Sequence, residues 1–535
     1  MSRFPSSKLG TNYSPSDSEI AHIHSLLAQP TSRFIQLSEQ IAELETERAT
    51  LKSFIDSHRA LLSPIRRVPV EILHRVFLEC LPNRGNCVMS TREAPLLLTR
   101  VCSGWRRLVQ SSPALWSSLH IHLPTQSSNS VSVALSEKIT RRLEGVKYWL
   151  AFANQCPLSL SVSSTRWRGQ ELMDILISHA HHWAHFAIQG PPNVLMPLQR
   201  LTLDQVPQLE SVLVQPTHGD SDDGTLVPHG YLTSWESVHL LQAPHLRRVV
   251  LFDIPLGILP QRWENIVDLA VERVWSITTS NAVEILSLCV KLAFFRLWVR
   301  EDHDESDDPH KQMRVEHRSL VVFHLILVGS IDITLQELSQ ALALPKLQDF
   351  RCQAHGSRHR NIANSLEPLG ALLVNSRELD ICEVDADIYP NRDSLLEFLH
   401  MVPEQLHVLM LTSEHSVWSS SRALVDNQVL KAFFPTDKGG YSALQSLEKI
   451  VFRNCTSFTE LNLVDFLNAR KETNNKLRRL QVHWTRERSF GIADQVRQSQ
   501  GNIEVELIYP PEPDLQKITS PWQGLEDLYA LGWDC

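Results

Sequence analysis

The spacing of hydrophobic residues near the start of the chain predicts one amphipathic helix. Between residues 34 and 62 apolar residues recur at alternate spacings of three and four, with gaps, among Glu, Gln and Arg residues. Pro64 removes a backbone donor, so we expect this helix, taken over residues 19–63, to end near Ser63. Residues 1–18 are rich in Ser, Pro and Asn, and we expect them to be disordered. The apolar positions of the helix are Phe34, Leu37, Ile41, Leu44, Leu51, Ile55 and Leu62.

This helix has two possible uses. Its heptad spacing permits self-association through residues 34–62, as in a coiled coil. However, Arg48 and His58 occupy heptad positions at which a coiled coil needs apolar residues, and only about four heptads are available. A helix that packs back onto its own chain is therefore the alternative.

Residues 64–122 contain shorter amphipathic segments. Pro69 stands where the first turn of a helix tolerates proline, and apolar residues then follow along one side. After a polar loop, helical spacing resumes with arginines between the apolar residues, and Leu115-Trp116 closes the segment. The apolar positions are Ile72, Leu73, Val76, Phe77 and Cys80 in the first helix and Leu97, Val101, Trp105 and Leu108 in the second.

In residues and in order, these segments resemble the F-box, whose family has a Leu-Pro opening, an E-I-L helix, a V-C-x-x-W-R helix and a final L-W. The matching residues are Val68-Pro69, Glu71 to Leu73, Val101 to Arg106, and Leu115-Trp116. Val68 replaces the leucine, and the loop over 82–94 is longer than in the shortest members. The alternative is that these are the first helices of a globular domain.

The resemblance implies docking to a Skp-family adaptor, and through it to a cullin, by an exposed apolar face. A unit of about 50 residues is marginal alone, so burial against a partner would complete it. The residues that the resemblance assigns to adaptor binding are Val68, Pro69, Ile72, Leu73, Val76, Phe77, Leu97, Val101, Cys102, Trp105, Leu115 and Trp116.

A strand-like phrase with apolar residues at its first, fourth and sixth positions recurs within residues 123–510. Helix-like segments such as NAVEILSLC lie between the phrases, and the spacing is commonly about 26 to 30 residues, the upper range of leucine-rich repeats. We therefore expect an α/β fold in which an N-terminal helix and a three-helix F-box precede an irregular leucine-rich-repeat solenoid, with parallel strands and outer helices. An ordinary α/β domain is the alternative, because residues 205–235 break the period. Counting starts at the first apolar residue after the one or two leading residues, as in KLQDFRC with Leu347, Phe350 and Cys352, and the phrases are PLQRLTL, PHLRRVVL, NIVDLAV, KLAFFRL, SLVVFHL, KLQDFRC, QLHVLML, SLEKIVF and KLRRLQV.

Taken together, this layout resembles the expanded F-box family of mushroom-forming fungi, which carries a leading helix, an F-box and degenerate leucine-rich repeats. The resemblance implies a substrate-recognition subunit of a Skp-adaptor/cullin–RING ubiquitin ligase, in which the repeats bind an unknown target protein. A non-degradative F-box scaffold or binding protein is the alternative. We expect no enzyme, since the chain has no GxSxG, P-loop, dinucleotide-binding or kinase signature.

Charge and composition exclude several partners. The formal charge of −9 gives no general attraction to phosphate backbones, so we do not expect nucleic acid as a partner. The apolar run over 320–329 is about half as long as a membrane-spanning helix, so no membrane passage is expected. The nine cysteines include no CxxC pair and are typical of reduced thiols in a cytoplasmic or nuclear protein.

Two motifs raise the question of a metal. His181 and His185 have the i, i+4 spacing of zinc ligands on a helix, but no third ligand is evident, and Trp183, Phe186 and Ile188 alternate as in a strand. The acidic runs at 218–224 and 301–310 lack the offsets of a calcium loop and are typical of solvated insertions. We expect no metal and no cofactor. We expect the tail over 511–535 to cap the last repeat or to bind a partner.

Overall fold

The computed structural model divides the chain into two compact units, residues 1–76 and 77–535, which are described separately. All structural statements concern the described residues alone. These are residues 5–123, 133–164, 170–217, 239–252, 263–272, 277–301, 314–355, 368–413, 424–434, 444, 446–471, 476–484, 492–499 and 501–509.

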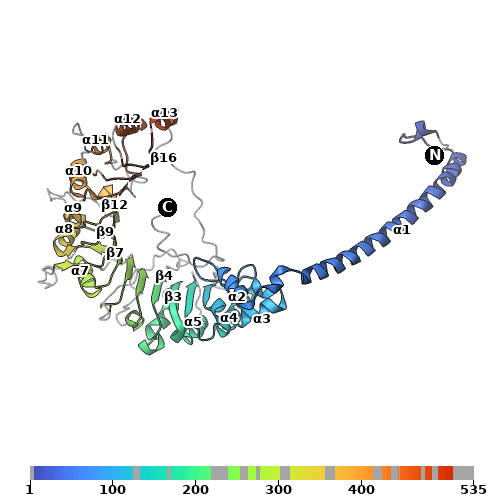
Figure 1. Cartoon of the computed structure of the whole chain (residues 1–535), viewed down its shortest axis with the longest axis horizontal. Coiled ribbons are helices and arrows are strands. Elements are labelled where there is room, and N and C mark those ends of the chain that lie inside the picture. Colours follow the sequence, from blue (N-terminus) through green and yellow to red (C-terminus); the bar gives the residue numbers. More distant parts are fainter. Residues whose placement is uncertain are drawn as a thin grey trace. The chain divides into compact units, whose positions relative to one another are not determined.

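The first unit is dominated by the helix α1, Asp17–Leu61 (Figure 1). The predicted N-terminal helix is therefore confirmed, and it ends close to the expected residue. It is followed by a 3-10 turn, η2, Pro64–Arg67, and by the first residues of α2, Val70–Glu79. The apolar side chains of α1 are largely exposed, in contrast to the core of the second unit.

Polar contacts join the residues before α1 to its first turn. A 3-10 turn, η1, spans Ser6–Lys8, and the Glu19 carboxylate accepts hydrogen bonds from the Ser16 backbone N–H at 2.9 Å and the Tyr13 hydroxyl at 2.9 Å. The Lys8 ammonium lies 3.1 Å from the same carboxylate. The Ser16 N–H, with Lys8 and Tyr13, lowers the pKa of Glu19 to about 2. The capping box formed by Ser16 and Glu19 explains why the helix begins here.

Four short helical segments open the region after α1. They are α2, the 3-10 turn η3, Leu98–Arg100, the helix α3, Ser103–Gln110, and the 3-10 turn η4, Pro113–Trp116. The last of these leads within two residues into the first strand, β1, Ser118–His122. The sheet thus begins inside residues 64–122, before the boundary at 123 that the sequence indicated.

The second unit is built around a parallel sheet of 14 strands that follow one another in chain order. A separate two-stranded sheet pairs β8, Val315–Glu316, with β10, Leu342–Ala343. The parallel architecture expected from the phrase pattern is confirmed. After β1 the strands of the large sheet are β2 Leu158–Ser163, β3 Trp183–Gly190, β4 Ser211–Pro216, β5 Arg248–Phe252, β6 Asp268–Glu272, β7 Phe294–Arg300, β9 Val322–Val328, β11 Asp349–His355, β12 Ile381–Asp385, β13 Val408–Thr412, β14 Lys449–Arg453, β15 Arg479–His483 and β16 Glu504–Ile508.

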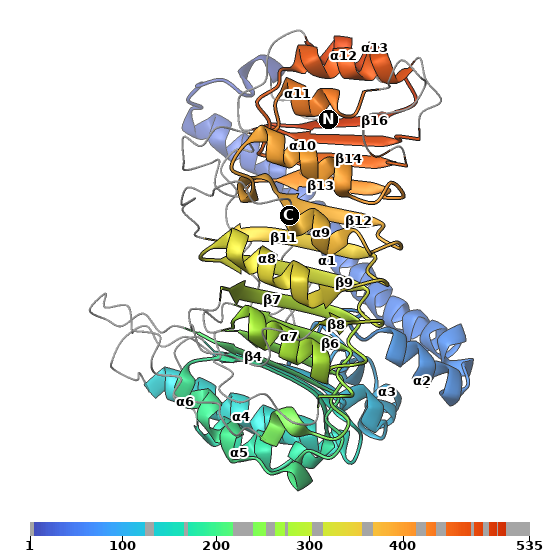
Figure 2. The same ribbon diagram turned by 90° about the vertical axis from the view of Figure 1, so that its left-hand side faces the viewer.

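Helices cover one side of this curved sheet and leave its inner side to the strands, as Figures 1 and 2 show. Parallel strands require a crossover between them, and the helices supply it. The buried sides of these helices and of the strands form a continuous core. The helices are α4 Val133–Ala153, α5 Gln170–Ile177, α6 Pro192–Leu195, α7 Thr279–Leu288, α8 Ile331–Ala341, α9 Pro368–Leu373, α10 Arg392–Met401, α11 Asn427–Lys431, α12 Glu460–Lys471 and α13 Ile492–Ser499.

One core residue of each strand forms an unbroken row across the large sheet. The pairing register aligns the row from Leu119 in β1 to Val505 in β16, and every member except Val505 is buried. The pairing register decides which face of the sheet each side chain occupies. This row of buried residues, with the row two residues later in each strand, therefore favours the observed register. The row consists of Leu119, Leu160, Phe186, Val212, Val249, Leu269, Phe295, Phe323, Phe350, Cys382, Leu409, Ile450, Leu480 and Val505.

The first of the predicted strand phrases, PLQRLTL, is wrong. Its residues form two 3-10 turns, η6, Met196–Arg200, and η7, Leu203–Gln205, where Pro197 opens the first turn and Thr202 with Gln205 caps the second. The strand of this repeat is β4, which lies in the stretch that the sequence indicated as a break in the period. In each of the other phrases a strand begins inside the phrase and continues beyond its last residue.

His317 links neighbouring repeats through both of its ring nitrogens. Its Nδ1 accepts a hydrogen bond from the Leu320 backbone N–H at 3.1 Å, so Nε2 carries the proton and donates to the Cys289 carbonyl at 3.0 Å. Burial lowers the pKa of this imidazole, which favours the neutral form that both bonds require. The side chain therefore ties the backbone at the end of α7 to the turn at 317–320.

Candidate protein-interaction site

Helix α2 exposes apolar residues on one side. Ile72 and Val76, one helical turn apart, are 52% and 47% exposed, and Pro69 before them is also exposed. Leu73 and Phe77, each one residue further along, are buried. An amphipathic helix of this length normally exposes polar groups on its outer side, so the exposed isoleucine and valine are candidates for contact with a partner.

The second unit carries a further exposed apolar pair at the turn before α3. Leu97 and Val101 are 44% and 55% exposed, and both have helical backbone angles. The next residue, Cys102, is also exposed, and its Sγ accepts a hydrogen bond from the Trp105 backbone N–H at 3.4 Å, which caps α3. The Arg106 Nε donates to the Thr99 carbonyl at 2.9 Å and fixes the angle between η3 and α3.

Aromatic contacts hold the helices of this region in place. The half-buried Trp105 ring packs edge-on against the buried Phe77 ring, with 4.7 Å between centroids. Trp116 is buried, and its Nε1 donates to the Val109 carbonyl at 2.9 Å, while its own carbonyl accepts from the Trp149 Nε1 at 2.8 Å. These bonds join α3, η4 and α4 at the point where the sheet begins.

The twelve residues that the F-box resemblance assigns to adaptor binding therefore have different exposures. Buried side chains cannot touch a partner in this conformation. Leu73, Phe77, Leu115 and Trp116 are buried, so they could contribute only by packing against the residues that are exposed. Val68 and Trp105 are half-buried. The exposed members of the set are Pro69, Ile72, Val76, Leu97, Val101 and Cys102.

The inner side of the sheet carries a group of charged residues from neighbouring strands. Arg296 in β7 lies 3.2 Å from the Glu272 carboxylate in β6, while Arg351 in β11 lies 3.1 Å from Asp349 and 3.7 Å from Glu383 in β12. The register brings them side by side, since Arg296 pairs with His324 of β9, which pairs with Arg351. Sequence analysis missed this cluster.

His324 stands between these two arginines. Burial, together with the positive charges of Arg351 and Arg296, lowers its pKa to about 2, so the imidazole is neutral at physiological pH. Beside it, Trp298, Ile326 and Val328 form a small buried apolar cluster on β7 and β9. His324, Arg296 and this apolar cluster are themselves buried, whereas Arg351 is partly exposed on this side of the sheet.

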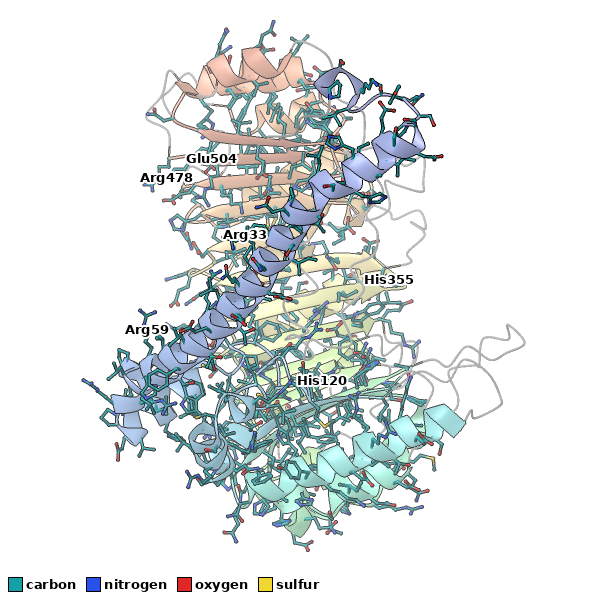
Figure 3. The ribbon with its side chains drawn as sticks, turned by 90° about the vertical axis from the view of Figure 1, so that its right-hand side faces the viewer. Arg33, Arg59, His120, His355, Arg478 and Glu504 are labelled. Atoms are coloured by element: carbon teal, nitrogen blue, oxygen red, sulfur yellow. The ribbon has the colours of Figure 1, made fainter. Side chains whose placement is uncertain are left out.

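His120 lies on the same side of the sheet, in the edge strand β1. Figure 3 shows the side chains of this side between labelled His120 and labelled Glu504. The His120 ring is buried, and its Nδ1 lies 2.9 Å from the Ser161 hydroxyl. Burial, with smaller contributions from His122 and Arg142, lowers its pKa from 6.5 to about 4.

This lowered pKa predicts a loss of stability in acid. The unfolded state takes up a proton on His120 below about pH 6.5, and the folded state only below about pH 4. The free energy of unfolding is therefore highest above pH 6.5 and decreases as the pH falls from 6.5 toward 4. From about pH 7 to about pH 5 the expected cost is roughly 2 kcal/mol for this one histidine. His120→Gln should lose less in melting temperature than the wild type over this range, and equal losses would contradict the assignment.

The two histidines considered as zinc ligands do not share a helical face. His181 lies in the 3-10 turn η5, Ala180–His182, and His185 lies on β3, where it pairs with Ser211. No group of three or more His, Cys, Asp or Glu residues in the described part of the chain could hold a metal ion. The acidic run at 218–224, residues 302–310 of the second run and the tail over 511–535 lie outside the described residues.

Comparisons with known proteins add no family to these observations. No protein-family model matches the chain, and no curated protein matches it. Among the described helices, none is both long and apolar enough to cross a membrane.

Proposed function

We propose that this chain is the substrate-recognition subunit of a Skp-adaptor/cullin–RING ubiquitin ligase. Residues 64–122 act as an F-box that docks the Skp-family adaptor, and the sheet of the second unit acts as an irregular leucine-rich-repeat receptor for a target protein. The protein catalyses nothing itself, because it holds the target near a ubiquitin-loaded enzyme supplied by the rest of the ligase.

The observation that carries the docking half is the exposure of apolar residues at motif positions. Ile72 and Val76 follow the Val68-Pro69 opening, and Leu97 and Val101 precede Cys102 and Trp105. Burying the exposed half of four such side chains against a partner would stabilise a complex by about 3 kcal/mol, at roughly 0.8 kcal/mol or more for each. Short helices with exposed apolar side chains suit a partner that supplies the missing core.

The receptor half rests on the sheet. A parallel strand that is followed by a helix cannot bury its apolar residues alone, and the in-register row from Leu119 to Val505 is how stacked repeats bury theirs. The inner side carries charged groups from strands distant in sequence, such as the partly exposed Arg351 on β11 and the exposed pair of Arg479 on β15 and Glu504 on β16, 2.9 Å apart. Such a wide sheet surface suits a folded protein better than a small molecule, which usually occupies an enclosed cavity.

A trapping experiment distinguishes a receptor from the alternative, a non-degradative scaffold. The double variant Val76→Glu with Val101→Glu, which should not dock the adaptor, is expressed beside the wild type, and proteins bound to the variant are identified. Under the receptor proposal, these proteins accumulate with the variant, and their half-lives shorten severalfold when the wild type is expressed. Half-lives that are the same with both forms would favour the scaffold.

A further inference from the structure

Helix α1 carries a longer apolar stripe than residues 34–62 alone. Since the helix begins at Asp17, the alternate spacing of three and four continues back to Ile20 without a break. We call this stripe the heptad seam. It consists of Ile20, Ile23, Leu27, Pro30, Phe34, Leu37, Ile41, Leu44, Arg48, Leu51, Ile55, His58 and Leu62.

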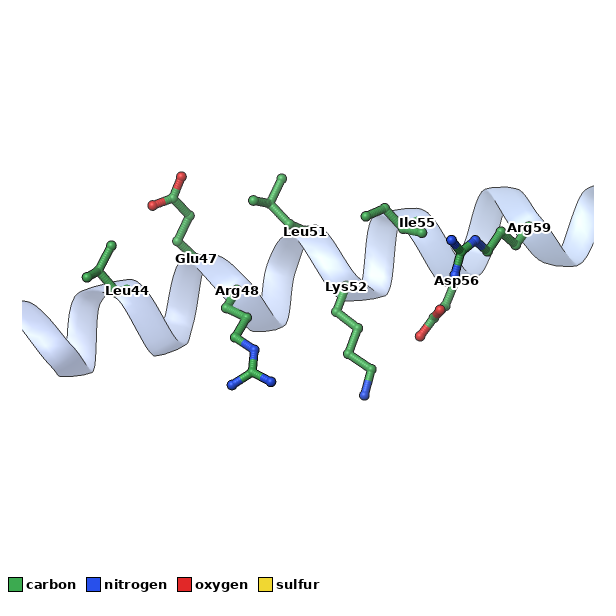
Figure 4. A pocket seen from close by; sticks show the side chains of 8 residues that line it. All are labelled: Leu44, Glu47, Arg48, Leu51, Lys52, Ile55, Asp56 and Arg59. Carbon is green, nitrogen blue, oxygen red and sulfur yellow. The ribbon is translucent and has the colours of Figure 1, made fainter.

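The apolar seam residues are mostly exposed. Ile23 is half-buried, the other large apolar residues of the seam are 39% exposed at Ile20 to 71% at Phe34, and Phe54 beside the seam is 62% exposed. Figure 4 shows part of the seam, a shallow groove lined by Leu44, Leu51 and Ile55 with charged residues at its edges. Six heptads exceed the three or four that a stable coiled coil needs, so the seam is long enough for a stable helix pair.

Two positions in the interior of the seam are unsuited to a coiled-coil core, and the third residue that is not a large hydrophobic, His58, lies near the end of the seam. Pro30 lacks a backbone donor and has a short side chain, and Arg48 is charged. In Figure 4 the Arg48 and Lys52 side chains extend to one side of the helix, whereas Leu44 and Leu51 extend to the other. The Arg48 guanidinium therefore leans out of the apolar row, as a long charged side chain at the edge of a core does.

We propose that α1 pairs with α1 of a second copy of the chain in an antiparallel coiled coil centred near Glu39. In this register the two unsuited positions meet each other, since Pro30 of one copy faces Arg48 of the other. The remaining layers bring Ile23 opposite Ile55, Leu27 opposite Leu51, Phe34 opposite Leu44, Leu37 opposite Ile41, and Ile20 opposite His58.

The residues that flank the seam favour the same register. In an antiparallel pair, the residues just before the first seam position of each heptad face one another across the interface. Arg33 then faces Glu47 of the second copy, and exposed Phe54 faces Leu26. A parallel, in-register pair would instead place Arg48 against Arg48 in the core, where like charges repel and are desolvated.

This pairing does not depend on adaptor docking, because the seam lies in α1 and the proposed adaptor contacts begin at Val68. The full chain is tested by light scattering coupled to size-exclusion chromatography at tens of micromolar. The expected mass is twice 60.9 kDa. Leu37→Asp with Ile41→Asp should give the monomer mass and raise the dissociation constant at least ~100-fold. Ile35→Asp, an equally exposed site off the seam, should remain a dimer.

Charge reversal tests the register. Arg33→Glu alone and Glu47→Arg alone should each raise the dissociation constant by about fivefold, and the double variant should restore it, because the two residues face each other only in the antiparallel register. A monomeric wild type, as expected if α1 packs back onto its own chain, would overturn the pairing. A dimer that the double variant fails to restore would overturn the antiparallel register.

Discussion

Replacing Val76 and Val101 together by glutamate is expected to weaken binding to a Skp-family adaptor at least ~100-fold while leaving the melting temperature nearly unchanged. Each valine would bury the exposed half of its side chain in the complex, and each loss costs roughly 0.8 kcal/mol or more before the larger cost of desolvating the new carboxylates is added. Both side chains are about half exposed in the free chain, so folding does not depend on them. Titration calorimetry with the purified adaptor and a thermal melt measure the two quantities.

Val290→Glu with Val374→Glu provides the matched control. These valines are 57% and 55% exposed and lie outside residues 64–122. The control should bind the adaptor as the wild type does. If it loses as much affinity as the docking variant, or if the docking variant binds normally, the assignment of the docking residues is wrong. A Trp105→Ala variant would be less informative, because that half-buried ring packs on Phe77 and its loss would also disturb folding.

Phe323→Ala is expected to destabilise the second unit by about 3–5 kcal/mol. The ring is fully buried in the central row of the sheet, stacked on the Phe295 ring at 5.7 Å and tilted against the Phe350 ring at 5.9 Å. Removing it leaves a cavity between two neighbouring strands, and close-packed repeats relax only partly around such a cavity. Denaturant unfolding followed by circular dichroism measures the change.

Ile333→Ala on α8 is the control for this effect, because the side chain is 49% exposed. It should change the free energy of unfolding by no more than about 0.5 kcal/mol. A Phe323→Ala variant as stable as the control would show that the row of buried residues is not what holds neighbouring strands together.

Much of the sheet could be predicted from the sequence, because apolar residues at the fourth and sixth positions of each phrase must lie on one face of a strand. The pattern failed at PLQRLTL, where a 3-10 turn produces similar apolar spacing and local proline chemistry decides the outcome. The pattern also missed β12, in which Cys382 is the residue that belongs to the buried row. Burial raises the pKa of the Cys382 thiol. A small apolar cysteine is a weak signal in a search for leucines.

The candidate docking residues show a different limit. Motif order selected a segment to examine, yet it could not separate Ile72 and Val76, which are exposed, from Leu73 and Phe77, which are buried. All four are apolar, and only tertiary packing decides which side of a short helix is covered. The role of Trp116 as a bridge between Val109 and Trp149 likewise depends on residues brought close by the fold.

The charged group on the inner side of the sheet could not have been found from the sequence. Glu272, Arg296, Asp349 and Arg351 come from three strands whose separation along the chain varies, and two intervening segments lie outside the described residues. Their proximity follows from the register of the sheet. Spacing in the sequence gives no measure of register between distant strands.

Direct binding of the wild-type full chain to a purified Skp-family adaptor is the measurement that tests the central proposal. Titration calorimetry should give one adaptor per chain with a dissociation constant of about 1 μM or below, and with a negative change in heat capacity, since apolar surface is buried. A chain that melts cooperatively, and is therefore folded, but shows no binding at tens of micromolar adaptor would contradict the F-box assignment.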